Sequence, residues 1–183
     1  MKHLIYIIII TLGLLVPYEC FTQEEDDDRK RVLFDFDQSG NINEYVFQFM
    51  NDGDWVDDIR WTFKYNSSGE TAEKTEQYRD FENDTWINEQ KYISVFDGNG
   101  NLKEYYRQFW VPGPDVWQNN WRDIYHYDNH GNNTQYLEQN WDHENQQWVN
   151  YFRNLSFFDG EGNLVQVIEQ FWLPDENKWV EEK

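Results

Sequence analysis

The chain has 183 residues, of which 19% are aromatic, and a formal net charge of −20. This length is enough for one domain with a core. A surface this acidic repels phosphate backbones and anionic lipids, so we expect neither nucleic acid nor a membrane surface as a partner.

Residues 1–22 are predicted to be a signal peptide. A basic start is followed by an apolar run from Leu4 to Leu15, which Pro17 ends. This run is shorter than the ~20 residues that span a bilayer, but it suits the core of a signal peptide; the alternative is a buried helix. We therefore predict export to the periplasm, the cell surface or the medium. A lipoprotein anchored through Cys20, the sole cysteine, is less favoured because larger residues precede it.

Residues 23–30 hold an acidic run that turns basic, which is typical of a solvated linker. Residues 31–183 form a repeat domain. Five tryptophans stand 31 residues apart, namely Trp55, Trp86, Trp117, Trp148 and Trp179. Between them recur turns such as Asp128-Asn-His-Gly131-Asn132, in which an Asp or Asn bonds back to the turn and a glycine supplies a left-handed conformation.

This pattern predicts an all-β fold, an antiparallel meander of five β-hairpin repeats and no helix after the leader. The piece from Arg31 to Asp37 and the piece from Trp179 to Lys183 add up to one full strand. The sheet therefore either closes into a ten-stranded barrel or stays an open twisted sheet.

Counting across each turn predicts the register. Tyr92 should face Tyr106 and Gln90 should face Gln108, which places Trp86, Asn88 and Tyr92 on one face and Lys91 on the other. Glutamines and asparagines recur beside the tryptophans, which predicts side chains bonded to one another. The recurring bases should meet glutamates in the cross-strand pairs Arg60–Glu76, Arg122–Glu138 and Arg153–Glu169.

No catalytic constellation is present, so the sequence predicts a protein that is not an enzyme and has no cofactor and no metal. The spacing Asp97-x-Asn99-x-Asn101 is similar to a calcium loop, but its glycine is misplaced and the bidentate glutamate is missing. The Arg–Glu pairs recur with the fold, which favours a structural role over acid–base catalysis.

The turn-and-aromatic pattern, as in Tyr127-Asp128-Asn-His-Gly131-Asn132 and Phe158-Asp159-Gly-Glu-Gly162-Asn163, resembles the tyrosine-aspartate hairpin repeats of bacterial secreted and surface proteins. It is also similar to MORN-type and antitoxin-type hairpin repeats. The unit here is longer, and its Trp-x-Asn start is not part of their usual pattern. The resemblance implies an exported protein of a Gram-negative bacterium, and it transfers no site residue.

Two functions remain open. The leading one is a non-catalytic exported binding or scaffold protein whose partner is a glycan or a protein. Sugars would stack on the tryptophans that flank the far loops of the hairpins, namely Trp110, Trp117, Trp141, Trp148, Trp172 and Trp179. The alternative is an immunity-type or inhibitor protein whose acidic surface meets a basic protein partner.

Overall fold

The computed structural model describes residues 19–21 and 29–181, so the predicted leader and linker lie almost wholly outside the described residues. The described chain is all β apart from one short 3-10 helix, Pro174–Glu176. Its strands are β1 (Glu19–Phe21), β2 (Lys30–Phe36), β3 (Ile42–Asn51), β4 (Asp54–Tyr65), β5 (Thr71–Asp80), β6 (Thr85–Phe96), β7 (Leu102–Val111), β8 (Val116–Tyr127), β9 (Asn133–Asp142), β10 (Gln147–Phe158), β11 (Leu164–Leu173) and β12 (Lys178–Glu181). No helix in this part of the chain is long and apolar enough to cross a membrane.

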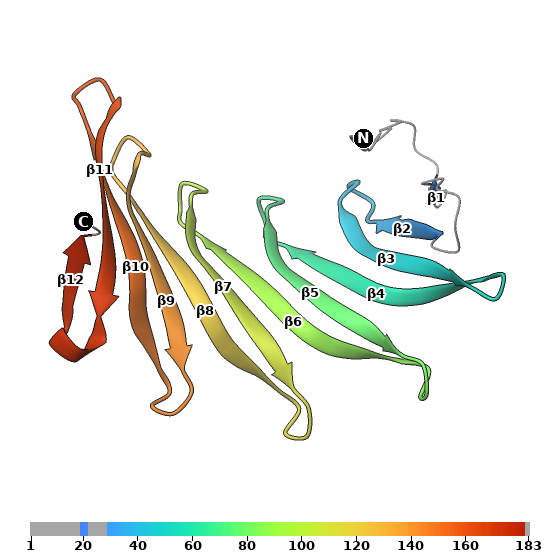
Figure 1. Cartoon of the computed structure of the whole chain (residues 1–183). Coiled ribbons are helices and arrows are strands. Elements are labelled where there is room, and N and C mark those ends of the chain that lie inside the picture. Colours follow the sequence, from blue (N-terminus) through green and yellow to red (C-terminus); the bar gives the residue numbers. More distant parts are fainter. Residues whose placement is uncertain (1–18, 22–28, 182–183) are drawn as a thin grey trace.

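The strands form one sheet in chain order from β1 to β12, and every pairing is antiparallel. Figure 1 shows a single twisted, curved layer with β2 and β12 near opposite ends. The prediction of an open twisted sheet is confirmed. The alternative of a closed barrel is wrong, because β12 pairs with β11 and β2 pairs with β1 and β3.

The predicted turns are present at one end of every hairpin. In the fourth turn the N–H groups of His130 and Asn132 donate to Asp128 Oδ1 at 2.8 and 2.9 Å. Gly131 has φ +85°, the left-handed conformation that glycine adopts at the least cost. In the third turn the carboxylate of Asp97 accepts the corresponding bonds from Asn99 and Asn101, so the residues of the calcium-like spacing hold a turn.

The predicted register is wrong by one residue. Beyond each turn a bulge puts two residues of the second strand opposite one residue of the first, so Tyr92 faces Arg107 and Lys91 faces Gln108. Each recurring base therefore meets a glutamine, where the predicted partner was a glutamate for Arg60, Arg122 and Arg153 and was Arg107 for Lys91. Arg122 faces Gln139, whereas Glu138 faces Asp123 on the other side of the sheet. The same shift replaces the predicted Arg60–Glu76 and Arg153–Glu169 pairs by Arg60–Gln77 and Arg153–Gln170.

A second bulge near the middle of the long strands corrects the predicted faces. On β6 it falls at Glu89, because Gln77 pairs with Asn88 while Glu76 pairs with Gln90. The alternation of side chains resets there. As a result Lys91 lies on the face of Trp86 and Asn88, and Tyr92 lies on the opposite face.

The sheet has no second layer among the described residues, and no hydrophobic side chain there is fully buried. The deepest side chains are polar, namely Gln48, Thr75 and Glu76 at 9% exposure each. Stability must therefore come from the backbone ladder and from side chains packed across neighbouring strands, each pair contributing roughly 0.2–1 kcal/mol.

Candidate binding surface

One side of the sheet, which we call the ladder face, carries five sets of three side chains. Each set consists of a base, the glutamine opposite it on the next strand, and the tryptophan that the base covers. The bases are Arg31, Arg60, Lys91, Arg122 and Arg153; the glutamines are Gln48, Gln77, Gln108, Gln139 and Gln170; the tryptophans are Trp55, Trp86, Trp117, Trp148 and Trp179.

In the fourth set, Arg122 Nε donates to Gln139 Oε1 at 2.7 Å, and its guanidinium carbon lies 4.6 Å from the ring centre of Trp148. Gln139 Nε2 then donates to Asn150 Oδ1 at 2.7 Å. The predicted bonding between recurring amides is thus present. These contacts join three consecutive strands, which a single-layer sheet needs because no second layer holds it together.

The six predicted ligand-stacking tryptophans lie on the ladder face as three cross-strand pairs. The ring centres of Trp110 and Trp117 are 5.1 Å apart, those of Trp141 and Trp148 5.0 Å, and those of Trp172 and Trp179 5.1 Å, each pair edge to face. All six are half-buried.

One member of each pair also has a ring face occupied from within the chain. Lys91 Nζ lies 4.5 Å from the ring centre of Trp117, and the guanidinium carbon of Arg153 lies 4.4 Å from that of Trp179. Trp148 is covered by Arg122 in the same way. A sugar stacking on these three rings has to use the remaining ring faces.

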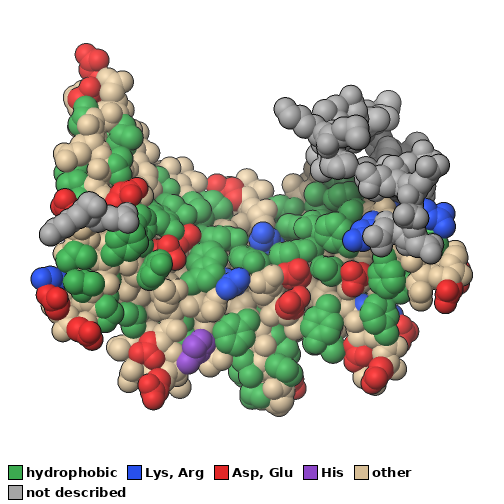
Figure 2. Space-filling view, in the orientation of Figure 1, with side chains coloured by type: hydrophobic (Ala, Val, Ile, Leu, Met, Phe, Trp, Pro, Cys, Tyr) green, Lys and Arg blue, Asp and Glu red, His purple; other side chains and the backbone are tan. Residues whose placement is uncertain are grey.

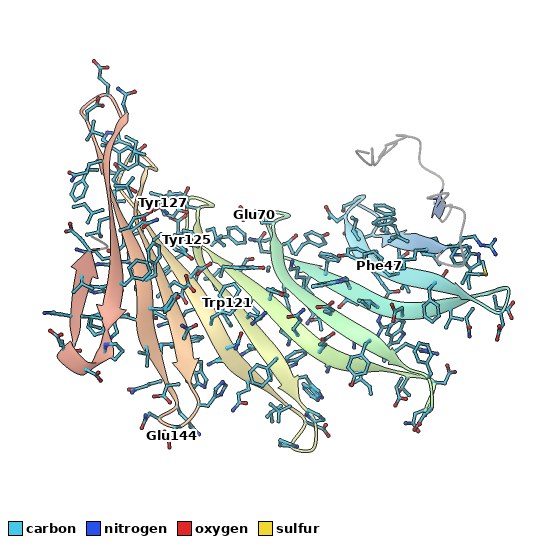
Figure 3. All side chains as sticks on the ribbon, in the orientation of Figure 1. Phe47, Glu70, Trp121, Tyr125, Tyr127 and Glu144 are labelled. Carbon is cyan, nitrogen blue, oxygen red and sulfur yellow. The ribbon has the colours of Figure 1, made fainter. Side chains whose placement is uncertain are left out.

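The other side, the aromatic face, carries a row of rings that crosses the sheet from β2 to β11. Its members are Phe34, Tyr45, Trp61, Tyr92, Tyr105, Trp121, Tyr125, Tyr136, Phe152 and Phe171. Ring centres of neighbouring members lie 6.0 Å apart for Trp61–Tyr92, 5.9 Å for Tyr92–Tyr105 and 5.7 Å for Tyr105–Trp121. Figure 2 shows hydrophobic side chains gathered in a band over the middle strands, and Figure 3 labels Phe47, Trp121 and Tyr125 of this face.

Cations already lie on part of this row. Lys74 Nζ is 5.0 Å from the ring centre of Trp61 and 4.6 Å from that of Tyr92, and the guanidinium carbon of Arg107 is 5.7 Å from that of Trp121. The rings of the aromatic face therefore attract ammonium and guanidinium groups through their negative faces.

Carboxylates interrupt the aromatic row at its centre. Asp123 on β8 faces Glu138 on β9, two like charges side by side. Tyr136 donates from its hydroxyl to Asp123 Oδ1 at 2.9 Å. No ion pair formed among the described residues includes either carboxylate, and like charges directly opposite destabilise a sheet.

Burial and the charge of Asp123 act on the protonation of this cluster. Burial raises the pKa of the Asp123 carboxyl, although hydrogen bonds from Tyr136 and Tyr125 act in the opposite direction. Burial raises the pKa of Glu138, and the charge of Asp123 raises it further. The pKa of Tyr125 rises to about 12, mainly through burial, and that of Tyr136 is also raised. Asp123 and Glu138 are therefore held against burial at the centre of the aromatic face, and no ion pair among the described residues offsets it.

The fold has counterparts among solved structures. A protein of unknown function from Bacteroides fragilis matches with a TM-score of 0.53 and 12% identity, covering 68% of this chain and 88% of that chain. DUF3836 family proteins from Bacteroides vulgatus and Parabacteroides distasonis match with TM-scores of 0.42 and 0.41 and identities of 18% and 23%. They cover 51% and 49% of this chain and 91% and 87% of theirs. No family model and no curated protein matches the sequence. The likeness to the first protein shows the fold alone.

Sequence reasoning identified the tryptophan pairs but missed the aromatic face and its acidic centre. The signal was the spacing of five residues between a tryptophan and the base that follows it on the same strand, as from Trp117 to Arg122. An odd spacing puts two residues on opposite faces of a regular strand. A base that lies on the same face as the preceding tryptophan therefore requires a bulge between the two residues.

Proposed function

We propose that this protein is a non-catalytic, exported binding protein that uses its aromatic face to hold a basic polypeptide. The observation that carries the proposal is the uncompensated Asp123–Glu138 pair set within the row of rings. Arginine suits such a surface best, because its guanidinium stacks on aromatic rings and pairs with carboxylates at the same time. The negative charge of the whole chain adds long-range attraction for a basic partner.

A titration with an oligoarginine peptide, followed by calorimetry, tests this proposal. The double variant Asp123→Asn with Glu138→Gln should weaken binding by about tenfold or more, which corresponds to about 1.4 kcal/mol. The matched control is Asp175→Asn with Glu176→Gln, which removes the same charge from a far loop. Equal losses in the two variants would mean that the peptide senses only net charge.

A glycan is the second candidate, on the ladder face. Trp110, Trp141 and Trp172 are half-buried, and no cation of the described residues lies over their rings. Successive hairpins place such tryptophans roughly 10 Å apart, twice the strand spacing, which suits a chain of sugars. Trp141→Ala should abolish binding to a soluble β-glucan if this candidate is right, while Tyr105→Ala should leave that binding unchanged. The reverse pattern favours the basic partner.

A further inference from the structure

A cation of the chain itself lies on two rings of the aromatic face. Lys74 on β5 faces Tyr92 on β6, and its Nζ lies 4.6 Å from the ring centre of Tyr92 and 5.0 Å from that of Trp61. The two rings are stacked, with centres 6.0 Å apart and planes at 28°. Lys74 Nζ forms no ion pair and no hydrogen bond with another described residue, so the ring faces are its direct contacts. These two rings therefore already form a site for a cation.

The repeat does not require a lysine at this position. Lys74 stands five residues after the turn glycine Gly69, and the residues at the same distance from the other turn glycines are Tyr45, Tyr105, Tyr136 and Val167. The three tyrosines belong to the row of rings on the aromatic face. A lysine therefore stands where three of the other four units place a ring of that row.

Carboxylates without a cation lie beside the same rings. Glu76 faces Trp61 across β4 and β5, is only 9% exposed, and accepts a hydrogen bond from Gln90 Nε2. Burial raises the pKa of the Glu89 carboxyl, and the charge of Glu76 raises it further, so these two carboxyl groups lie close together. No ion pair in the described part of the chain includes either of them. The surroundings of Trp61 therefore combine rings with uncompensated negative charge.

The cluster at Asp123 has the same composition but no cation of its own on the corresponding rings. Tyr105 faces Asp123, and Tyr136 donates a hydrogen bond to it. No Lys or Arg of the described residues lies over either tyrosine ring. The two clusters therefore differ in whether a cation of the chain occupies their rings.

We infer that Trp61, Tyr92 and Glu76 form a second site for a guanidinium group, which Lys74 occupies in the free protein. This inference rests on the proposed function, because the same basic partner would supply the guanidinium group. An ammonium group already on the rings excludes a second cation by covering the ring faces and by charge repulsion. Lys74 therefore restricts an arginine-rich partner to the cluster at Asp123.

Calorimetric titration of the protein with the oligoarginine peptide tests this inference. Lys74→Met removes the ammonium group and keeps an unbranched side chain, so it should tighten binding by about tenfold through one added cation–π contact with the peptide. Lys74→Arg keeps a cation on the rings and should leave the affinity unchanged. Lys64→Met is the matched control for the change in net charge, because Lys64 lies on the ladder face, where it pairs with Glu73.

Deletion of a ring separates an opened site from a simple change of charge. Tyr92→Leu should change the affinity of the unsubstituted protein little, because Lys74 already occupies that ring, but it should cancel the gain of Lys74→Met. The coupling between the two substitutions is therefore the decisive quantity. Circular dichroism and melting curves check that each variant is folded, and Trp61→Leu replaces Tyr92→Leu if the latter is not. A lysine with only a structural role would lower the melting temperature when replaced and leave the affinity unchanged.

The outcomes separate this inference from the proposed function. A gain in Lys74→Met no larger than that in Lys64→Met, or one that survives deletion of the ring, overturns the inference and leaves the proposed function standing. Binding by Lys74→Met but not by the unsubstituted protein supports the second site and contradicts the cluster at Asp123 as the binding site. Absence of binding by both proteins overturns both proposals.

Discussion

Replacing Lys91 by arginine should stabilise the protein by about 1 kcal/mol. Lys91 Nζ lies 4.5 Å from the ring centre of Trp117 and 3.8 Å from Glu73 Oε2, so the lysine already makes the ring contact and the ion pair of its series. Arg60, Arg122 and Arg153 make one further contact, the bond from Nε to a glutamine oxygen at 2.7–2.8 Å. Arginine at position 91 should form the same bond with Gln108, whose Nε2 already donates to Asn119.

The magnitude follows from that single bond. A hydrogen bond contributes about 0.5–1.5 kcal/mol net, and more when one partner is charged. Solvent reduces this gain, because the Lys91 side chain retains 16% exposure and those of Arg60 and Arg122 retain 24%. A gain of 1 kcal/mol raises the melting temperature of a domain of this size by about 2–4 °C. Burial also lowers the pKa of Lys91, a penalty that arginine resists because its own pKa is far above neutrality.

Thermal and urea denaturation of matched variants measure this gain. Arg122→Lys should lower stability by a similar amount, since it removes the Nε bond while keeping the charge over Trp148. The gain from Lys91→Arg should vanish when Gln108 is replaced by Leu, as a double-mutant cycle shows directly. An unchanged melting temperature for both Lys91→Arg and Arg122→Lys would refute the reasoning, because the stack on tryptophan would then carry the whole effect.

The remaining predictions concern the turns and the acidic centre. Gly131→Ala should destabilise the protein by about 1–2 kcal/mol because φ is +85° there, whereas Gly160→Ala, which has open space and no positive φ, should change the melting temperature little. Asp123→Asn should raise the melting temperature at pH 7 while weakening oligoarginine binding, because it removes a charge that Glu138 opposes; a fall in stability would contradict this. The pKa values of the Asp123 and Glu138 carboxyls are raised in the folded state, so protonation of these groups favours folding at low pH. This contribution to the free energy of unfolding is lost as pH rises through the folded-state pKa values. Binding of a cation favours the ionised forms, so affinity for oligoarginine should rise over the same pH window, and a calorimetric titration at several pH values measures it.

The hairpins and their number could be predicted from the sequence because their determinants are local. A turn such as Asp128 to Asn132 needs only an acceptor side chain at its first position and a glycine that takes a left-handed conformation, and both recur every 31 residues with the tryptophans, apart from the shorter first unit. The contacts between glutamines and asparagines in the three middle repeats were also predictable, since both amides recur there in register.

The faces of the sheet and its openness were decided by tertiary structure. A bulge such as the one at Glu89 shifts the pairing of two strands by one residue without changing the turn that joins them. Whether it forms depends on which side chains then meet across the strands. Here it puts Lys91 beside Trp117 and leaves Tyr92 in the aromatic row. Closure depends on twist and curvature accumulated over many strands, which no single hairpin encodes. For that reason the pieces from Arg31 to Asp37 and from Trp179 to Lys183 could add up to one strand in the sequence, while β2 and β12 lie at opposite ends of an open sheet.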